Sequence, residues 1–156
     1  MLLWLIRHGE TAWNADQRFQ GWSDIALNER GRDQARLLGE RLQNVPPFDA
    51  VYVSDRLRAL ETAQIIVGDS ASLMLEPRLR EINFGKFEGL TMAEIRDRYP
   101  QEAAAWQADN HGNPHDGETL DAVAQRVGAF LDELRAQSAP EKRTLIVAHG
   151  GTLGIL

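Results

Sequence analysis

Length, composition and charge already exclude several classes of protein. The 156 residues can bury roughly two thirds of their unfolded surface, so we expect one domain over residues 1–156 that needs no covalent cross-link. The absence of cysteine excludes a disulfide framework and thiolate metal sites, and it fits a reducing, cytoplasmic location. A net charge of −6 disfavours a sequence-independent grip on nucleic acid, so no nucleic-acid partner is expected.

The first half of the chain alternates strand and helix patterns. Leu2–Ile6 is a continuous apolar run, which is typical of a buried strand and is too short for a signal peptide or a membrane span. Helical spacing from Glu29 to Asn44 ends at a pair of prolines. A strand at Ala50–Val53 and a helix at Leu57–Val67 follow. Residues 73–75 predict a short strand near an edge of the sheet, because a proline follows closely.

The second half continues the alternation after an irregular stretch. Residues 78–90 predict a loop, and a capping-box pattern at 91–94 starts a helix that ends before a proline. Further patterns predict a short helix over 101–108, a loop over 109–117, a helix over 120–134 and a strand over 144–148. We therefore expect a three-layer α/β/α sandwich on a mostly parallel sheet. The last residues look like the first turn of a helix that is cut off, so we expect the sequence to be part of a longer chain.

Two histidines stand directly after predicted strands, each followed by glycine. His8 follows the first strand beside Arg7, and His149 follows the last. Residues just beyond the carboxyl ends of parallel strands project into the crevice where ligands bind, so the two imidazoles are expected to face each other. After the strand Ala50–Val53, Arg58 lies one turn inside a helix and is expected to meet the same ligand. Two arginines and two histidines suit a phosphoryl group.

The ordered motifs of the chain resemble those of the histidine phosphatase superfamily, the phosphoglycerate-mutase-like proteins, over the whole length. The matching stretches are "LIRHGETAWN" with "RFQGWSDIALNERGRDQA", then "SDRLRALETA", "LREINFGKFEG", "DGETL" and "IVAHGG". A lone RHG tripeptide is weak evidence, but ordered matches with sensible spacing are specific. The stretch "EINFGKFEG" looks like the phosphatase branch, which includes the α-ribazole phosphatases.

The resemblance implies a catalytic role for five residues. His8 is the nucleophile that becomes phosphohistidine. Arg7, Arg58 and His149 bind the phosphoryl oxygens and stabilise charge during transfer. Glu81 is the general acid for the leaving alcohol and then the base for the incoming water.

The resemblance also implies supporting contacts to the substrate. Asn14 and the backbone at Gly150 assist the phosphoryl group, and Gln20 and Gly21 fall where the family contacts substrate. Thr11 and Glu118 also match pattern positions, for which hydrogen bonding within a loop is an equally good explanation. Tryptophans and phenylalanines near these motifs fit a pocket lining or a packed core equally well; they are Trp13, Trp22, Phe84, Phe87 and Trp106.

The resulting hypothesis is a metal-independent phosphatase, with no cofactor, that acts on a small phosphorylated substrate and has no membrane partner. Two alternatives stay open: a cofactor-dependent phosphoglycerate mutase, and a non-catalytic domain that binds a phosphorylated ligand. A metal site is disfavoured because the Gly and Pro between His111 and His115 prevent them from sharing one helical face. We expect these two histidines in a loop over the pocket mouth. No oligomeric state is predicted.

Overall fold

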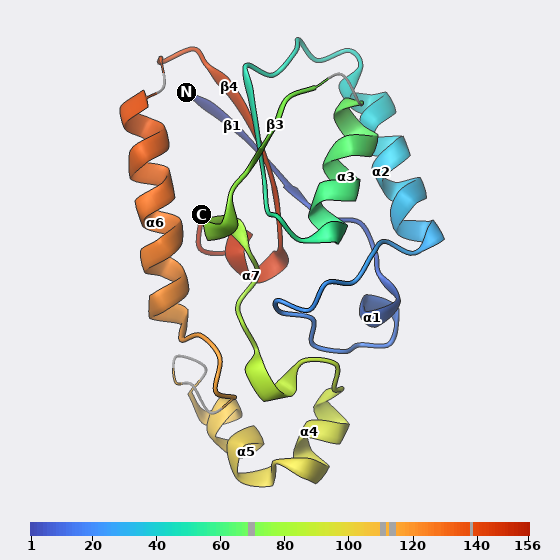
Figure 1. Cartoon of the computed structure of the whole chain (residues 1–156), viewed down its shortest axis with the longest axis vertical. Coiled ribbons are helices and arrows are strands. Elements are labelled where there is room, and N and C mark those ends of the chain that lie inside the picture. Colours follow the sequence, from blue (N-terminus) through green and yellow to red (C-terminus); the bar gives the residue numbers. More distant parts are fainter. Residues whose placement is uncertain (69–70, 110–111, 113–114, 138) are drawn as a thin grey trace.

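Parallel strands form one sheet in the order β1-β4-β2-β3. The computed structural model describes residues 1–68, 71–109, 112, 115–137 and 139–156. Within them the strands are β1 (Leu2–Arg7), β2 (Ala50–Val53), β3 (Leu73–Leu75) and β4 (Arg143–Ala148). The predicted edge position of β3 is confirmed, and β1 forms the other edge (Figure 1).

The helices follow the predicted order. In the described residues they are α1 (Ala12–Ala15), α2 (Glu29–Leu42), α3 (Leu57–Val67), α4 (Met92–Arg98), α5 (Pro100–Ala108), α6 (Leu120–Gln137) and α7 (Gly150–Leu153). The sequence patterns missed α1, a single turn held by a capping box between Thr11 and Asn14. Two short 3₁₀ turns, 77–79 and 85–87, overlap the predicted loop. No helix in the described part of the chain is long and apolar enough to cross a membrane.

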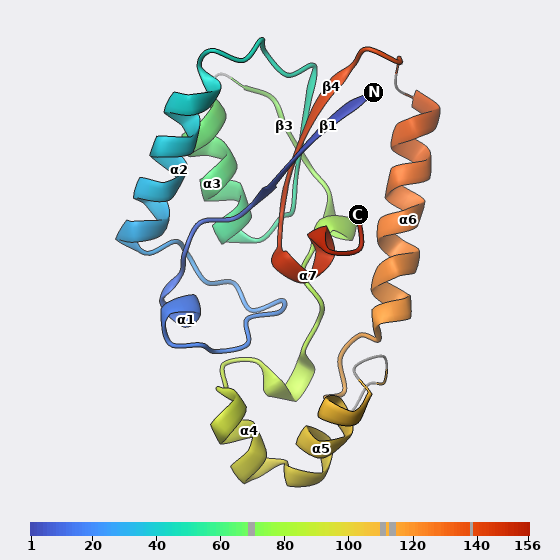
Figure 2. The same cartoon turned by 180° about the vertical axis from the view of Figure 1, so that it is seen from behind.

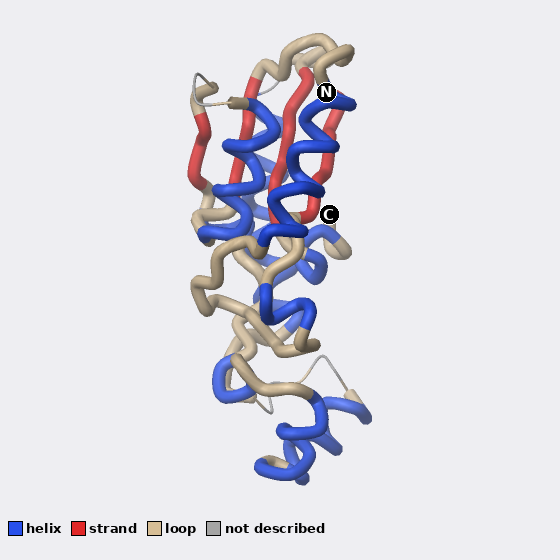
Figure 3. Tube along the Cα trace, turned by 90° about the vertical axis from the view of Figure 1, so that its right-hand side faces the viewer, coloured by secondary structure: helices blue, strands red, loops and turns tan. Residues whose placement is uncertain are grey.

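The central strand β4 places apolar side chains on both faces of the sheet. Leu145 and Val147 are fully buried against α3, with side chains of α2 packed around them. The alternate residues Ile146 and Ala148 face α6, where Phe130 packs. Helices therefore cover both faces of a parallel sheet, as Figures 1, 2 and 3 show, and the predicted three-layer sandwich is confirmed.

A smaller lobe lies beyond the carboxyl ends of the strands, in the lower part of Figure 1. Its core joins α4 and α5 to the turn at 85–87 through Phe87, Ile95 and Ala103. His115 belongs to this lobe and has no exposed surface. The expectation that His115 lines a pocket mouth is therefore wrong, because aromatic rings enclose it. His111 lies outside the described residues.

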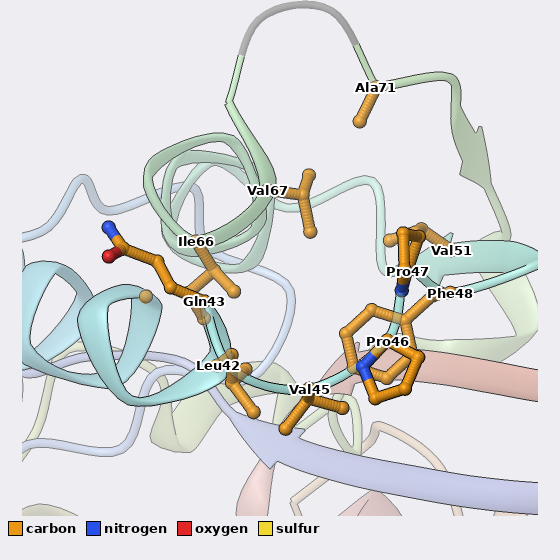
Figure 4. A pocket seen from close by; sticks show the side chains of 11 residues that line it. Leu42, Gln43, Val45, Pro46, Pro47, Phe48, Val51, Ile66, Val67 and Ala71 are labelled. Atoms are coloured by element: carbon orange, nitrogen blue, oxygen red, sulfur yellow. The ribbon is translucent and has the colours of Figure 1, made fainter.

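An apolar cavity lies at the opposite end of the sheet (Figure 4). Its volume is about 230 Å³, and Leu42, Phe48, Val51 and Ile66 contribute to its wall. Phe48 and the residues before it precede the amino end of β2, whereas His8 and His149 follow the carboxyl ends of β1 and β4. The cavity is thus separated from the predicted site by the length of the sheet.

We predict that two identical substitutions differ sharply in their effect on stability. Leu145→Ala removes a fully buried side chain from β4 and is expected to lower the free energy of unfolding by about 2–5 kcal/mol. The control Leu37→Ala truncates a side chain on α2 that is 63% exposed, and a change within about 0.5 kcal/mol is expected. Urea unfolding of both variants measures the difference. Equal losses would contradict the placement of the core.

Candidate active site

His8 follows β1 and is held in one tautomer. Its Nδ1 lies 2.7 Å from the carbonyl oxygen of Gly9, and Arg58 Nε donates to its Nε2 at 3.3 Å. The proton therefore belongs on Nδ1, and the lone pair of Nε2 faces the guanidinium. Burial lowers the pKa of His8 to about 4, and the charges of Arg58 and Arg7 contribute in the same direction. The ring is thus neutral at physiological pH, which is the form that can act as a nucleophile.

Arg58 is fully buried in the first turn of α3, and each of its three side-chain nitrogens donates to a fixed acceptor. Besides Nε on His8, Nη1 donates to the carbonyl of Ser23 at 2.8 Å and Nη2 to that of Gly21 at 2.7 Å. Burial lowers its pKa to about 10, although the charge of Glu81 acts in the opposite direction. Arg58 therefore stays charged at neutral pH. Gly21 is expected to contact substrate, and in the structure its carbonyl accepts a hydrogen bond from Arg58.

His149 lies beside His8, as the strand-end pattern predicted. The two ring centroids are 5.1 Å apart at an angle of 60°. His149 Nε2 lies 2.8 Å from Ser54 Oγ, and its buried Nδ1 has no hydrogen-bond partner among the described residues. Burial, reinforced by the charge of Arg58, lowers the pKa of His149 well below 6.5. Two neutral imidazoles therefore meet where β1 and β4 end.

Arg7 carries the accessible positive charge of this site. Its guanidinium makes no hydrogen bond or ion pair with any residue for which the structure gives a position, and a Cβ on Gly150 would lie 3.5 Å from its Cζ. The side chain thus lies against the first turn of α7. A cavity of about 370 Å³ opens here, lined by Arg7, His8, Glu10, Asn14 and Gln34. A cation beside a neutral imidazole in an open cavity suits an anionic ligand.

Glu81 reaches the same region from the segment that follows β3. Its Oε2 accepts a hydrogen bond from the Gly151 N–H at 3.1 Å, and its Oε1 accepts one from the Ile82 N–H at 3.0 Å. A Cβ at position 151 would lie 2.5 Å from Glu81 Oε1, so a side chain there would displace the Glu81 carboxylate. The carboxylate therefore lies against the turn that begins just after His149.

The side chains of Asn14 and Gln20 are bound to other parts of the fold, unlike that of Arg7, which faces the cavity. Asn14 lines the cavity, but its Oδ1 accepts from the N–H and the hydroxyl of Thr11, each at 3.1 Å. Gln20 is 7% exposed, and its Oε1 lies 2.8 Å from Thr11 Oγ. The side-chain oxygens of both residues are thus engaged within the fold around Thr11.

Glu88 organises the site although the sequence patterns did not single it out. Its Oε1 accepts from the N–H groups of Trp22 and Phe84, and its Oε2 from the N–H and the hydroxyl of Ser23, at 2.6–3.1 Å. This carboxylate fixes the loop whose carbonyls receive Arg58. The sequence signal that could have indicated Glu88 is its position within the matched stretch "FGKFEG", which shows no helical or strand periodicity.

The aromatic residues divide between the site and the lobe. Trp22 Nε1 donates to the carbonyl of Glu81 at 2.9 Å, and the Arg80 guanidinium lies 4.7 Å from the Trp22 ring. Other rings enclose His115, with centroids 5.1–5.8 Å from it; they are Phe84, Phe87 and Trp106. Core packing therefore accounts for these three rings, whereas Trp22 borders the segment of Glu81.

Comparisons with known proteins by family model, by sequence and by structure agree on one family. The family model described as histidine phosphatase superfamily (branch 1) matches residues 3–156. A 2,3-bisphosphoglycerate-dependent phosphoglycerate mutase of Gloeobacter violaceus is 32% identical, with 97% of this chain and 72% of that protein aligned. A glucosyl-3-phosphoglycerate phosphatase of Mycolicibacterium vanbaalenii is 35% identical, covering 97% and 70%. The crystal structure of the α-ribazole phosphatase from Shigella flexneri superposes with a TM-score of 0.92 at 35% identity, covering 98% of this chain and 76% of that chain.

We predict that the His8 ring titrates with a midpoint near pH 4 instead of 6.5, measured by NMR of the ring nitrogens. Because the unfolded chain binds this proton more readily, the stability contributed by neutral His8 is full above pH 6.5 and is lost as the pH falls towards 4. The control His8→Gln carries no titrating ring, so its stability should fall less steeply over that range. A His8 midpoint near 6.5 would contradict the buried, neutral ring.

Proposed function

Since the chain belongs to the histidine phosphatase superfamily, we propose that it hydrolyses a small phosphomonoester through a phosphohistidine formed on His8. The observation that carries the proposal is the pair of neutral histidines, with ring centroids 5.1 Å apart, beside a cavity lined by the guanidinium of Arg7, which has no partner among the described residues. Phosphoryl transfer depends mostly on positioning and on charge stabilisation, and these side chains can supply both.

The first step transfers the phosphoryl group to the enzyme. His8 Nε2 attacks phosphorus while the bond from phosphorus to the alcohol oxygen breaks. Glu81 gives its proton to that oxygen, so the alcohol leaves neutral. Arg7 and His149 contact the phosphoryl oxygens. The hydrogen bond from Arg58 Nε to His8 Nε2, 3.3 Å in the resting site, breaks as Nε2 attacks, because that nitrogen has one lone pair, and the released N–H donates to a phosphoryl oxygen. The Gly9 carbonyl stabilises the proton that stays on Nδ1 as the ring becomes positive.

The second step returns the enzyme to its starting state. The Glu81 carboxylate removes a proton from a water molecule, whose oxygen attacks phosphorus. The phosphorus–nitrogen bond breaks, inorganic phosphate leaves, and His8 regains its neutral form. Glu81 is again protonated, so one water is consumed and no other reactant is needed.

The substrate class follows from the cavity and from the names of relatives. The residues around the cavity are all polar or charged, which favours a hydrophilic organic group. Named relatives act on glucosyl-3-phosphoglycerate or α-ribazole phosphate, both of which are phosphate esters of hydroxylated compounds. We favour hydrolysis over mutase activity because "EINFGKFEG" resembles the phosphatase branch. Phosphoglycerate mutase activity stays as the second candidate function, because one of the relatives is named as such a mutase.

A phosphate-release screen separates the candidate functions. The panel contains sugar phosphates, nucleotides, glycerate phosphates and α-ribazole phosphate, each with and without a chelator. Release of phosphate that persists with the chelator supports the proposal. Interconversion of phosphoglycerates with bisphosphoglycerate, without phosphate release, would establish the mutase instead. Tight binding with neither reaction would indicate a binding module.

We predict that the phosphate is carried by His8 and not by His149. Rapid quenching during turnover of labelled substrate should trap an acid-labile phosphoenzyme in the wild type. His8→Gln should abolish the label, because glutamine has no nucleophilic ring nitrogen. The matched change His149→Gln leaves His8 in place, so the label should still form at a lower rate. Label that persists in His8→Gln would overturn the assignment.

We also predict that Glu81→Gln lowers kcat by about 10²–10⁴-fold on an alkyl phosphate, because the amide can neither donate the proton nor remove one from water. Phosphoenzyme formation from 2,4-dinitrophenyl phosphate should continue, since dinitrophenolate leaves without a proton. Stopped-flow measurement of dinitrophenolate release tests this. An equal loss of the first step on both substrates would argue against general acid catalysis by Glu81.

A further inference from the structure

Arg126, on the inner face of α6, uses every donor of its guanidinium within the fold. Nη1 donates to the carbonyls of Arg78 and Arg80 at 2.6 and 2.8 Å, and Nη2 donates to the carbonyl of Glu81 at 3.0 Å. Nε and Nη2 also donate to the two carboxylate oxygens of Glu118 at 2.8 and 2.9 Å. The two side chains are 16% and 18% exposed. This bidentate pair is therefore largely shielded from water.

The Arg126–Glu118 pair holds the chain on both sides of Glu81. Arg126 binds carbonyls at and before Glu81, as described above. Glu118 Oε2 accepts from the N–H of Asn83 at 3.0 Å, and the N–H of Glu118 donates to the carbonyl of Asn83 at 2.9 Å. The backbone from three residues before Glu81 to two residues after it is thus attached to α6 and to the segment that leads into it.

This attachment replaces regular secondary structure. Residues 80–84 belong to no helix or strand, so their carbonyls lack ladder partners. A second set of bonds comes from the opposite side: Thr152 Oγ donates to the carbonyl of Arg80 at 2.6 Å, and the Gly151 N–H donates to the Glu81 carboxylate. Trp22 also donates to the Glu81 carbonyl. Glu81 is therefore held between α6 and α7 by side chains and by the Gly151 N–H, and not by the hydrogen bonds of a helix or a sheet.

We propose that Arg126, paired with Glu118, is a positioning residue that sets where the Glu81 carboxyl group meets the leaving oxygen. The inference rests on the proposed function, in which Glu81 donates a proton. A general acid acts only within about 2.6–3.2 Å of the atom it protonates, and a displacement of about 1 Å can cost about 10²-fold in rate. Loosening the backbone of residues 78–83 would displace this carboxylate while leaving His8 and Arg58, which are held by other contacts, in place.

The experiment compares two substrates that differ in their need for a proton. One is the best alkyl monoester found in the panel above, whose alcohol must be protonated as it leaves. The other is 2,4-dinitrophenyl phosphate, which needs no acid. The variants are Arg126→Lys, which cannot make the five bonds, and Glu118→Gln, which loses one acceptor and the charge. Arg135→Lys is the matched control, because Arg135 is also on α6 but is 66% exposed and pairs at the surface.

Arg126→Lys and Glu118→Gln are expected to lower kcat/KM for the alkyl monoester by about 100-fold, and for the dinitrophenyl ester by about threefold or less. Arg135→Lys should change neither value. The assays are run at a temperature below the thermal unfolding midpoint of every variant, so that each is folded. If Arg126→Lys does not fold, Glu118→Gln alone tests the positioning role. Equal losses on both substrates would overturn the positioning role while leaving the proposed function intact. A wild type inactive on both esters would instead refute the proposed function.

Discussion

The hydrogen bond between Arg58 and His8 is the interaction on which the site depends. A guanidinium without any exposed surface is costly to bury unless each of its donor groups finds an acceptor. Two acceptors are backbone carbonyls, at Gly21 and Ser23, and the third is the imidazole. Satisfying Arg58 therefore determines both the path of the 21–23 loop and the tautomer of His8. The same contact keeps the proton on Nδ1 and the lone pair on Nε2, which is the tautomer that the proposed nucleophile needs.

Carboxylates outside the reaction keep this arrangement rigid. Glu88 fixes the loop that receives Arg58, and Glu118 completes the pair that holds the segment of Glu81. Both act on irregular segments, where the backbone has no ladder partners of its own. Electrostatic catalysis benefits from groups that are already oriented before charge develops. The acidic composition of the chain is thus compatible with a cationic site, because some of its acidic residues serve to orient the cations.

Local patterns predicted what depends on neighbours in sequence. The bounds of β2, β3 and α3 and the meeting of His8 with His149 follow from apolar runs and from the geometry of parallel sheets. Contacts between distant segments were not predictable in this way. Arg126 meets carbonyls about 45 positions earlier only because α6 crosses the segment after β3. His115 was misplaced for the same reason, since the rings around it come from separate segments.

The two histidines have similar surroundings but different hydrogen-bond partners, which is the basis for proposing different roles for them. His8 lines the open cavity, and its Nδ1 is paired with the Gly9 carbonyl, so its lone pair is on Nε2, where it accepts from Arg58 Nε. His149 has no exposed surface, and its Nε2 is engaged by Ser54. If the Ser54 hydroxyl donates to Nε2, the unpartnered Nδ1 carries a proton and acts as a donor. In the proposed mechanism the nucleophile needs a lone pair and the group that binds the phosphoryl oxygens needs a proton to donate, so the hydrogen bonds of the two histidines suit these two roles although their side chains are the same.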